Sequence, residues 1–96
     1  MASFELSELA KRDLQDIHQY GIRQWGEAQA DRYYNALYDH LERIADDPMR
    51  YPLAENTMYG FRRSVFASHA IYFSASGDRV EILSIIRSQD TKRLQM

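Results

Sequence analysis

The sequence predicts one α+β domain made of a short N-terminal strand, an antiparallel two-helix hairpin and a three-stranded antiparallel sheet. In the first half of the chain, two long stretches repeat apolar residues with the 3.6-residue period of a helix. In the second half, three segments alternate with the two-residue period of strands and are separated by turn residues. Because 96 residues suffice for one core and leave no room for two, we expect residues 1–96 to form a single domain.

The chain is predicted to open with a strand over residues 3–6, which leads into a first helix. Ser7 is placed to cap this helix, and Glu8 puts a negative charge in its first turn. The helix should end near Arg23, because Gly26 breaks the pattern. Its apolar stripe consists of Ala10, Leu14, Ile17 and Gly21.

A second helix follows and packs back against the first, with the turn between them at Gly26. It ends at Asp46-Asp47-Pro48, because a proline disfavours helical backbone in the residue before it. Its apolar face consists of Ala30, Tyr33, Tyr34, Leu37, Leu41, Ile44 and Ala45.

The second half of the chain is predicted to form the sheet. Residues 50–60 contain two turn-forming residue types and no periodicity, so we expect a loop there. The predicted strands are Phe61–Phe66, His69–Ser74 and Arg79–Arg87, with a turn at residues 76–78. The last strand is apolar on both faces and should be central, with Val80, Ile82 and Ile86 on one face and Leu83 and Ile85 on the other.

Composition argues against several classes of protein. The chain has no cysteine, and its three histidines lack metal-ligand spacing, so we expect no metal and no cofactor. No phosphate loop or nucleophile elbow is present. The first residues do not resemble a signal peptide, and no apolar run is long enough to cross a bilayer, so we expect a cytoplasmic protein with no membrane partner.

The net charge of −2 hides an asymmetry between the two halves of the chain. Residues 1–59 carry a charge of −5 and residues 60–96 a charge of +3. Ten of the twelve cationic residues are arginines, which form forked contacts with carboxylates and phosphates. The basic half is either a solvated sheet face or a surface that faces nucleic acid or an acidic partner.

Four residues stand out as candidates for contact with a target. Arg62 and Arg63 point to opposite faces of a strand, so one lies toward the helix side or its edge and the other faces outward. Either they contact the target directly, or one is solvated and the other pairs with a helix carboxylate. His69 could serve as a general base, but a lone histidine on an apolar strand is more often packed and hydrogen-bonded. Arg87 closes the last strand and opens a polar tail.

These features in this order resemble the RelE/ParE toxin superfamily, and the local sequence is most similar to ParE. The resemblance covers nearly the whole chain, and the order and spacing of the pieces carry it. The pieces are Ala10–Ile17, Trp25-Gly26 before a helix rich in alanine and tyrosine, Ala45–Pro48, Gly60–Arg63, Ser68–Phe73, and Val80–Arg87 with Gln89-Asp90.

The resemblance implies a toxin of a type II toxin–antitoxin pair that inhibits DNA gyrase by binding and is neutralised by a ParD-like antitoxin. It implies binding rather than catalysis, and no sequence-specific nucleic-acid binding by the toxin alone. Target contacts are expected at Arg62, Arg63, His69, Arg87, Gln89 and Asp90. Antitoxin contacts are expected at Leu14, Ile17, Tyr34, Leu37 and Leu41.

Two alternatives remain. RelE relatives cut messenger RNA on the ribosome with basic residues and a late tyrosine or histidine, but no tyrosine or histidine follows Phe73 here. Many ParE sequences have histidine where this chain has Arg87, so this position also departs from the ParE pattern.

The third hypothesis is a non-toxic module that survives as an antitoxin partner, because a fold alone does not establish an activity.

Overall fold

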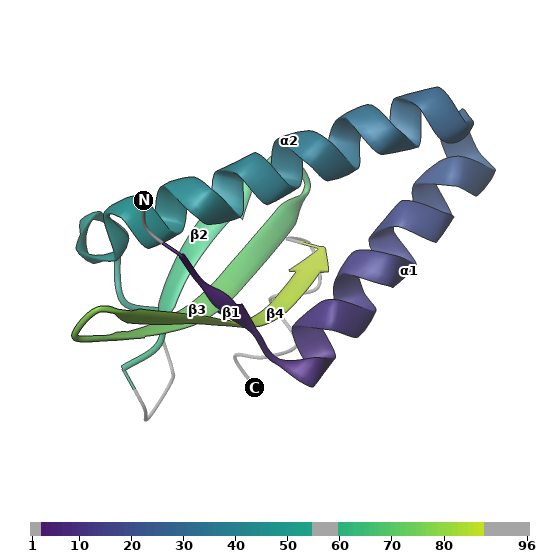
Figure 1. Cartoon of the computed structure of the whole chain (residues 1–96). Helices are drawn as coiled ribbons and strands as arrows, with labels where there is room; N and C mark the ends of the chain where they lie inside the picture. The colour runs from purple at the N-terminus through teal and green to yellow at the C-terminus, as the bar shows by residue number, and fades with distance from the viewer. Residues whose placement is uncertain (1–2, 55–59, 88–96) are drawn as a thin grey trace.

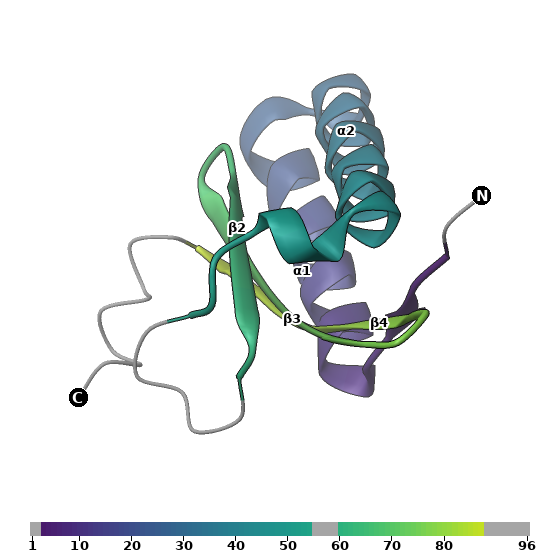
Figure 2. The same cartoon turned by 90° about the vertical axis from the view of Figure 1, so that its left-hand side faces the viewer.

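The computed structural model describes residues 3–54 and 60–87, which form a helical hairpin packed on one face of a mixed sheet (Figures 1 and 2). The sheet order is β1-β4-β3-β2, and β1 pairs parallel to β4 while the other pairs are antiparallel. The elements are β1 (Glu5–Leu6), α1 (Glu8–Trp25), α2 (Glu27–Asp46), the 3-10 helix η1 (Pro48–Arg50), β2 (Arg62–Phe66), β3 (His69–Ser76) and β4 (Arg79–Arg87).

The predicted α+β class is confirmed, but the sheet has a fourth strand. The opening strand joins β4, with Leu6 opposite Ile82, so the three-stranded antiparallel sheet becomes a four-stranded mixed one. Only two residues take part in this strand, and the two helices, β2 and β3 lie between it and β4 in the chain, which is long enough for a parallel pairing. β4 therefore lies inside the sheet, as its two apolar faces predicted.

Ser7 fixes both the start of α1 and its attachment to the sheet. Its Oγ accepts a hydrogen bond from the Ala10 N–H at 3.0 Å, which confirms the predicted N-cap. The same hydroxyl donates to the Leu83 carbonyl at 2.7 Å, and the Ser7 N–H donates to the Ile82 carbonyl at 3.0 Å. The first turn of α1 is thus bonded directly to β4.

Two glycines shape the hairpin, one in the turn and one where the helices touch. α1 continues to Trp25, two residues beyond the prediction, and Gly26 then adopts a φ of 90°, which favours glycine. At Gly21 a Cβ would lie 3.2 Å from the Ala30 Cβ, so the missing side chain allows the helices to approach closely. Neither helix of the described residues is apolar enough along its length to cross a bilayer.

β4 contains a bulge that the alternation of the sequence does not reveal. Tyr72 pairs with Ser84 but Phe73 pairs with Ile82, so Leu83 is an extra residue on β4. An extra residue inverts the faces beyond it. The prediction was therefore wrong for Ile85 and Ile86: Ile85 is 2% exposed and lies in the core with Ile82, whereas Ile86 is half-buried on the other face.

Asp13 of α1 holds this bulge. The Ile85 N–H donates to Asp13 Oδ2 at 2.8 Å. Burial raises the pKa of the Asp13 carboxyl, the bond from Ile85 opposes this rise, and the nearby Asp16 charge adds to it. A residue outside the apolar stripe of α1 is therefore part of the junction between helix and sheet.

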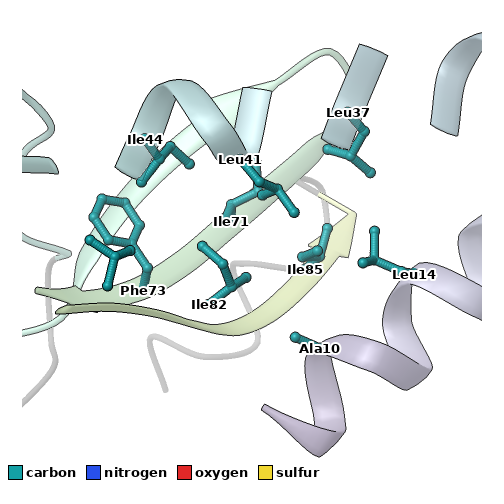
Figure 3. Close-up of a cluster of buried hydrophobic side chains, with 10 residues drawn as sticks. Ala10, Leu14, Leu37, Leu41, Ile44, Ile71, Phe73, Ile82 and Ile85 are labelled. Carbon is teal, nitrogen blue, oxygen red and sulfur yellow. The ribbon is translucent and has the colours of Figure 1, made fainter. Parts of the chain in front are cut away.

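The core lies between the helical hairpin and the sheet (Figure 3). The four residues of the α1 stripe do face the core: Ala10, Leu14 and Gly21 are buried, and Ile17 is half-buried. The buried side chains of the core are Ala10, Leu14, Leu37, Leu41, Ile44, Ile71, Phe73, Val80, Ile82 and Ile85. Most come from the helix stripes and from the inward faces of β3 and β4, so the sheet itself covers the apolar side of the hairpin.

Candidate functional site

A small pocket is lined by residues from the start of β3, the end of β4 and the helical hairpin. His69 and Arg87 are register partners on these strands, so their side chains lie on the same face of the sheet. The cavity volume is about 50 Å³. The lining residues are Ile17, Tyr20, Gly21, Trp25, Ala30, Tyr33, Ser68, His69 and Arg87.

The hairpin contributes the apolar part of this pocket. Gly21 and Ala30 are buried and bring little side-chain volume, which leaves space beside the close approach of the helices. Ile17 adds a half-buried aliphatic side chain. Trp25 is 59% exposed, and its ring packs edge-on against Tyr20 with centroids 6.0 Å apart. The exposed ring of Trp25 therefore borders a pocket whose other apolar walls are small side chains.

His69 is buried and hydrogen-bonded, as expected for a packed histidine. Its Nδ1 lies 2.6 Å from the Tyr33 hydroxyl and 3.5 Å from Ser68 Oγ. Burial lowers the pKa of His69, and the positive charge of Arg87 lowers it further. Burial raises the pKa of Tyr33, while hydrogen bonds from Ser68 oppose that rise. At neutral pH His69 is therefore an uncharged ring beside an uncharged phenol.

Arg87 is exposed but held in place by Tyr20. Its Nη2 donates to the Tyr20 hydroxyl at 3.0 Å, and the guanidinium carbon lies 4.7 Å from the centre of the Tyr20 ring. Both a hydrogen bond and a cation–π contact thus orient one side chain. The remaining N–H donors of the guanidinium can bind an incoming acceptor without the full loss of side-chain freedom.

The other predicted target-contact residues do not join this pocket. Arg62 lies on the helix face at the other end of β2, where its Nη1 donates to the Tyr51 carbonyl at 2.6 Å. Arg63 points to the opposite face, as predicted for neighbouring strand residues, and its Nε donates to the Tyr72 hydroxyl at 3.2 Å. The other two predicted contacts, Gln89 and Asp90, lie outside the described residues.

The structure corrects three of the expected antitoxin contacts. Leu14 is 3% exposed and Leu37 and Leu41 are 0% exposed, so these side chains offer no surface to a second chain. They belong to the core and pack against the chain's own sheet. Ile17 and Tyr34 remain half-buried and accessible.

Tyr34 belongs to a row of rings that runs beside the core. The row consists of Phe4, Tyr38, Tyr34 and His18, with successive centroids 5.4, 6.3 and 5.2 Å apart. His18 Nε2 also lies 2.7 Å from Asp31 Oδ1, which links the two helices. Tyr38 is 37% exposed, so this row is a second aromatic surface.

Sequence reasoning did not assign a site role to Tyr20, Tyr33 or Ser68. Tyr33 was expected to pack on the apolar face of α2, which hid its bond to His69. Tyr20 directly precedes Gly21 of the α1 stripe. This neighbourhood was the one sequence signal that could have placed Tyr20 at the edge of the pocket. No group of three or more histidine, aspartate or glutamate side chains in the described part of the chain is placed to hold a metal ion.

Comparisons with known proteins agree with this fold. A family model described as the ParE toxin of the type II toxin–antitoxin system, parDE, matches residues 4–91. Toxin ParE1 of Caulobacter vibrioides is 34% identical over 96 residues, which is all of this chain and 99% of that protein. A chain of the chromosomal ParDE toxin–antitoxin system from P. aeruginosa superposes with a TM-score of 0.78 at 18% identity, covering 91% of this chain and 96% of that one. The last likeness concerns the fold alone.

Proposed function

Because the chain belongs to the ParE toxin family of type II toxin–antitoxin systems, we propose that it inhibits DNA gyrase by binding and catalyses no reaction itself. As a toxin of such a system it has an antitoxin partner. The partner in this proposal is a ParD-like antitoxin. The proposed target acts on the chromosome, so the toxin acts in the cytoplasm.

The arrangement of Arg87 beside Trp25 carries this proposal. Tryptophan and arginine are the residue types that most often dominate binding energy at protein interfaces. Here both are exposed next to a hollow, and Tyr20 contacts each of them. A side chain that is already oriented loses less entropy on binding, so Arg87 is suited to be an anchor for the target.

The state of His69 supports binding over catalysis. A general base needs a free lone pair within reach of the proton that it takes. His69 is buried, and its Nδ1 is engaged by Tyr33, so Nε2 is the ring nitrogen left to take a proton. Its lowered pKa also makes it a weak base.

The same cluster of His69, Tyr33 and Arg87 is nevertheless the observation that favours the second candidate function, cleavage of messenger RNA on the ribosome. That function predicts cuts in translating messages when purified toxin is added. It also predicts that His69→Gln abolishes toxicity.

A gyrase supercoiling assay tests the proposal. Folded wild-type toxin in stoichiometric excess should block supercoiling, and Arg87→Ala should weaken inhibition on the order of tenfold, as for truncation of an interface anchor. Arg79→Ala is the matched control, because Arg79 is an exposed arginine at the other end of β4. Absence of inhibition by the wild type, or equal losses in both variants, would contradict the proposal.

A growth assay completes the test. Expression of the toxin without its antitoxin should arrest growth. Normal growth with soluble, folded protein would favour the hypothesis of a non-toxic module instead.

A further inference from the structure

We propose that the pocket between the hairpin and the sheet binds one aliphatic side chain of the antitoxin, together with a carboxylate that pairs with Arg87. This inference rests on the toxin–antitoxin function above and adds the chemical class of the ligand. It also places Ile17, an expected antitoxin contact, in one site with Arg87, an expected target contact.

The size of the pocket selects a small ligand. A cavity needs roughly 10–15 Å³ to hold one water molecule, so about 50 Å³ corresponds to on the order of four such spheres. That space matches the branched end of a leucine, isoleucine or valine side chain. It is too small to enclose a nucleobase with its sugar, so the pocket does not suit the DNA held by a gyrase complex.

The chemistry of the lining selects an apolar group next to an anion. Ile17, Gly21, Ala30 and the ring of Trp25 form the apolar part. Arg87 carries the positive charge of the lining. The lining also holds polar groups, but Tyr20 is already bonded to Arg87, and Tyr33 to His69. A bare phosphate would lose much of its hydration against the apolar walls for one cationic contact and few free polar groups, which disfavours it. An aliphatic carboxylate satisfies both parts of the lining.

Occupation of this pocket has a consequence for neutralisation. The antitoxin carboxylate would bind the same guanidinium that is proposed to anchor the target. The two partners would therefore exclude each other at Arg87, and the antitoxin would neutralise the toxin by direct competition. At this site the charge complementarity rests on Arg87, which favours an acidic residue in the antitoxin segment that enters the pocket.

The first experiment uses a small probe, 4-methylpentanoate, and the emission of Trp25, which is the sole tryptophan of the chain. The probe should change the emission saturably, and its uncharged amide should bind roughly two- to fivefold more weakly, as expected for loss of an exposed ion pair. Arg87→Gln should abolish this preference, whereas Arg79→Gln should keep it. No saturable response, or equal affinities of acid and amide for the wild type, would overturn the proposal.

A second readout distinguishes pocket binding from a non-specific effect on fluorescence. A bound carboxylate offsets the charge of Arg87, so the pKa of His69 should rise when the acid binds and stay unchanged with the amide. An NMR titration of the His69 ring protons measures this. A His69 pKa that does not respond to saturating acid would place the probe elsewhere and refute the site.

The third experiment identifies the source of the ligand. In the purified toxin–antitoxin complex, Trp25 should no longer respond to the probe, and Arg87→Gln should weaken antitoxin binding more than Arg79→Gln does. If the complex still binds the probe with unchanged affinity, the antitoxin is not the occupant, and the proposal fails. A wild-type toxin that binds probe and antitoxin in this way but leaves gyrase active would refute the proposed target and not the pocket.

Discussion

Replacement of Asp13 tests how the helical hairpin is joined to the sheet. In Asp13→Ala the Ile85 N–H loses its acceptor beside the bulge, and β1 does not reach it because β1 pairs only with Glu81 and Ile82 of β4. A buried donor without a partner costs about 1–3 kcal/mol. Because Asp13 is partly exposed and water can reach it, we expect the lower part of this range, about 1–2 kcal/mol.

This loss should be measurable by thermal unfolding. For a domain of this size 1 kcal/mol corresponds to roughly 4–8 °C in Tm, so Asp13→Ala should lower Tm by roughly 4–16 °C. Asp13→Asn keeps an oxygen acceptor and removes the charge that burial disfavours, so its Tm should stay close to the wild type. Asp16→Ala is the control: it is exposed, three residues away on the same helix, and should change stability by less than about 0.5 kcal/mol.

The pH dependence gives an independent check. The pKa of Asp13 is raised in the folded protein, so the folded state holds the proton more tightly than the unfolded state. The wild type should therefore gain stability from Asp13 as pH falls through the folded pKa toward the ordinary value of 3.8, and Asp13→Asn should lack this gain. Equal Tm values for Asp13→Ala and Asp16→Ala would show that the carboxylate does not hold the bulge.

Three further predictions concern the core and the histidines. Leu41→Ala should lower the free energy of unfolding in urea by about 2–5 kcal/mol, whereas Leu9→Ala, at a position that is 57% exposed, should change it by less than about 0.5 kcal/mol. Burial lowers the pKa of His40 in the folded protein, so the unfolded state binds the proton at higher pH. The free energy of unfolding should therefore fall as pH drops below 6.5. In His40→Gln the urea midpoint of unfolding should depend less on pH. Arg87→Gln should raise the pKa of His69 without bringing it to 6.5, because burial remains the larger cause, and an NMR titration of the ring protons checks this.

The helical hairpin was predictable because its signals are local. Apolar residues at offsets of three and four positions define one face, and Ser7 and Gly26 mark the boundaries through their own backbone preferences. The bulge at Leu83 was not predictable by alternation. The Leu83 carbonyl and the nearby Ile85 N–H bond to Ser7 and Asp13, which lie more than 70 residues away in the sequence.

The candidate site shows the same division. The sequence identified His69 and Arg87 as candidate target contacts, but it grouped them with Arg62 and Arg63. The strand register places Arg62 at the far end of β2 and Arg63 on the opposite face of the sheet. It interpreted Leu14 as a surface contact, because an apolar stripe looks the same whether it is covered by a partner or by the chain's own sheet.

The sequence by itself determined the order of the elements, the apolar faces of both helices and the family, since all of these depend on residue type and short-range spacing. The tertiary structure alone decided which apolar residues are buried and where the side chains of β4 change face. It also decided that Tyr20, Trp25 and Arg87 line one pocket. These depend on contacts between residues far apart along the chain, whose geometry is fixed when the hairpin packs on the sheet.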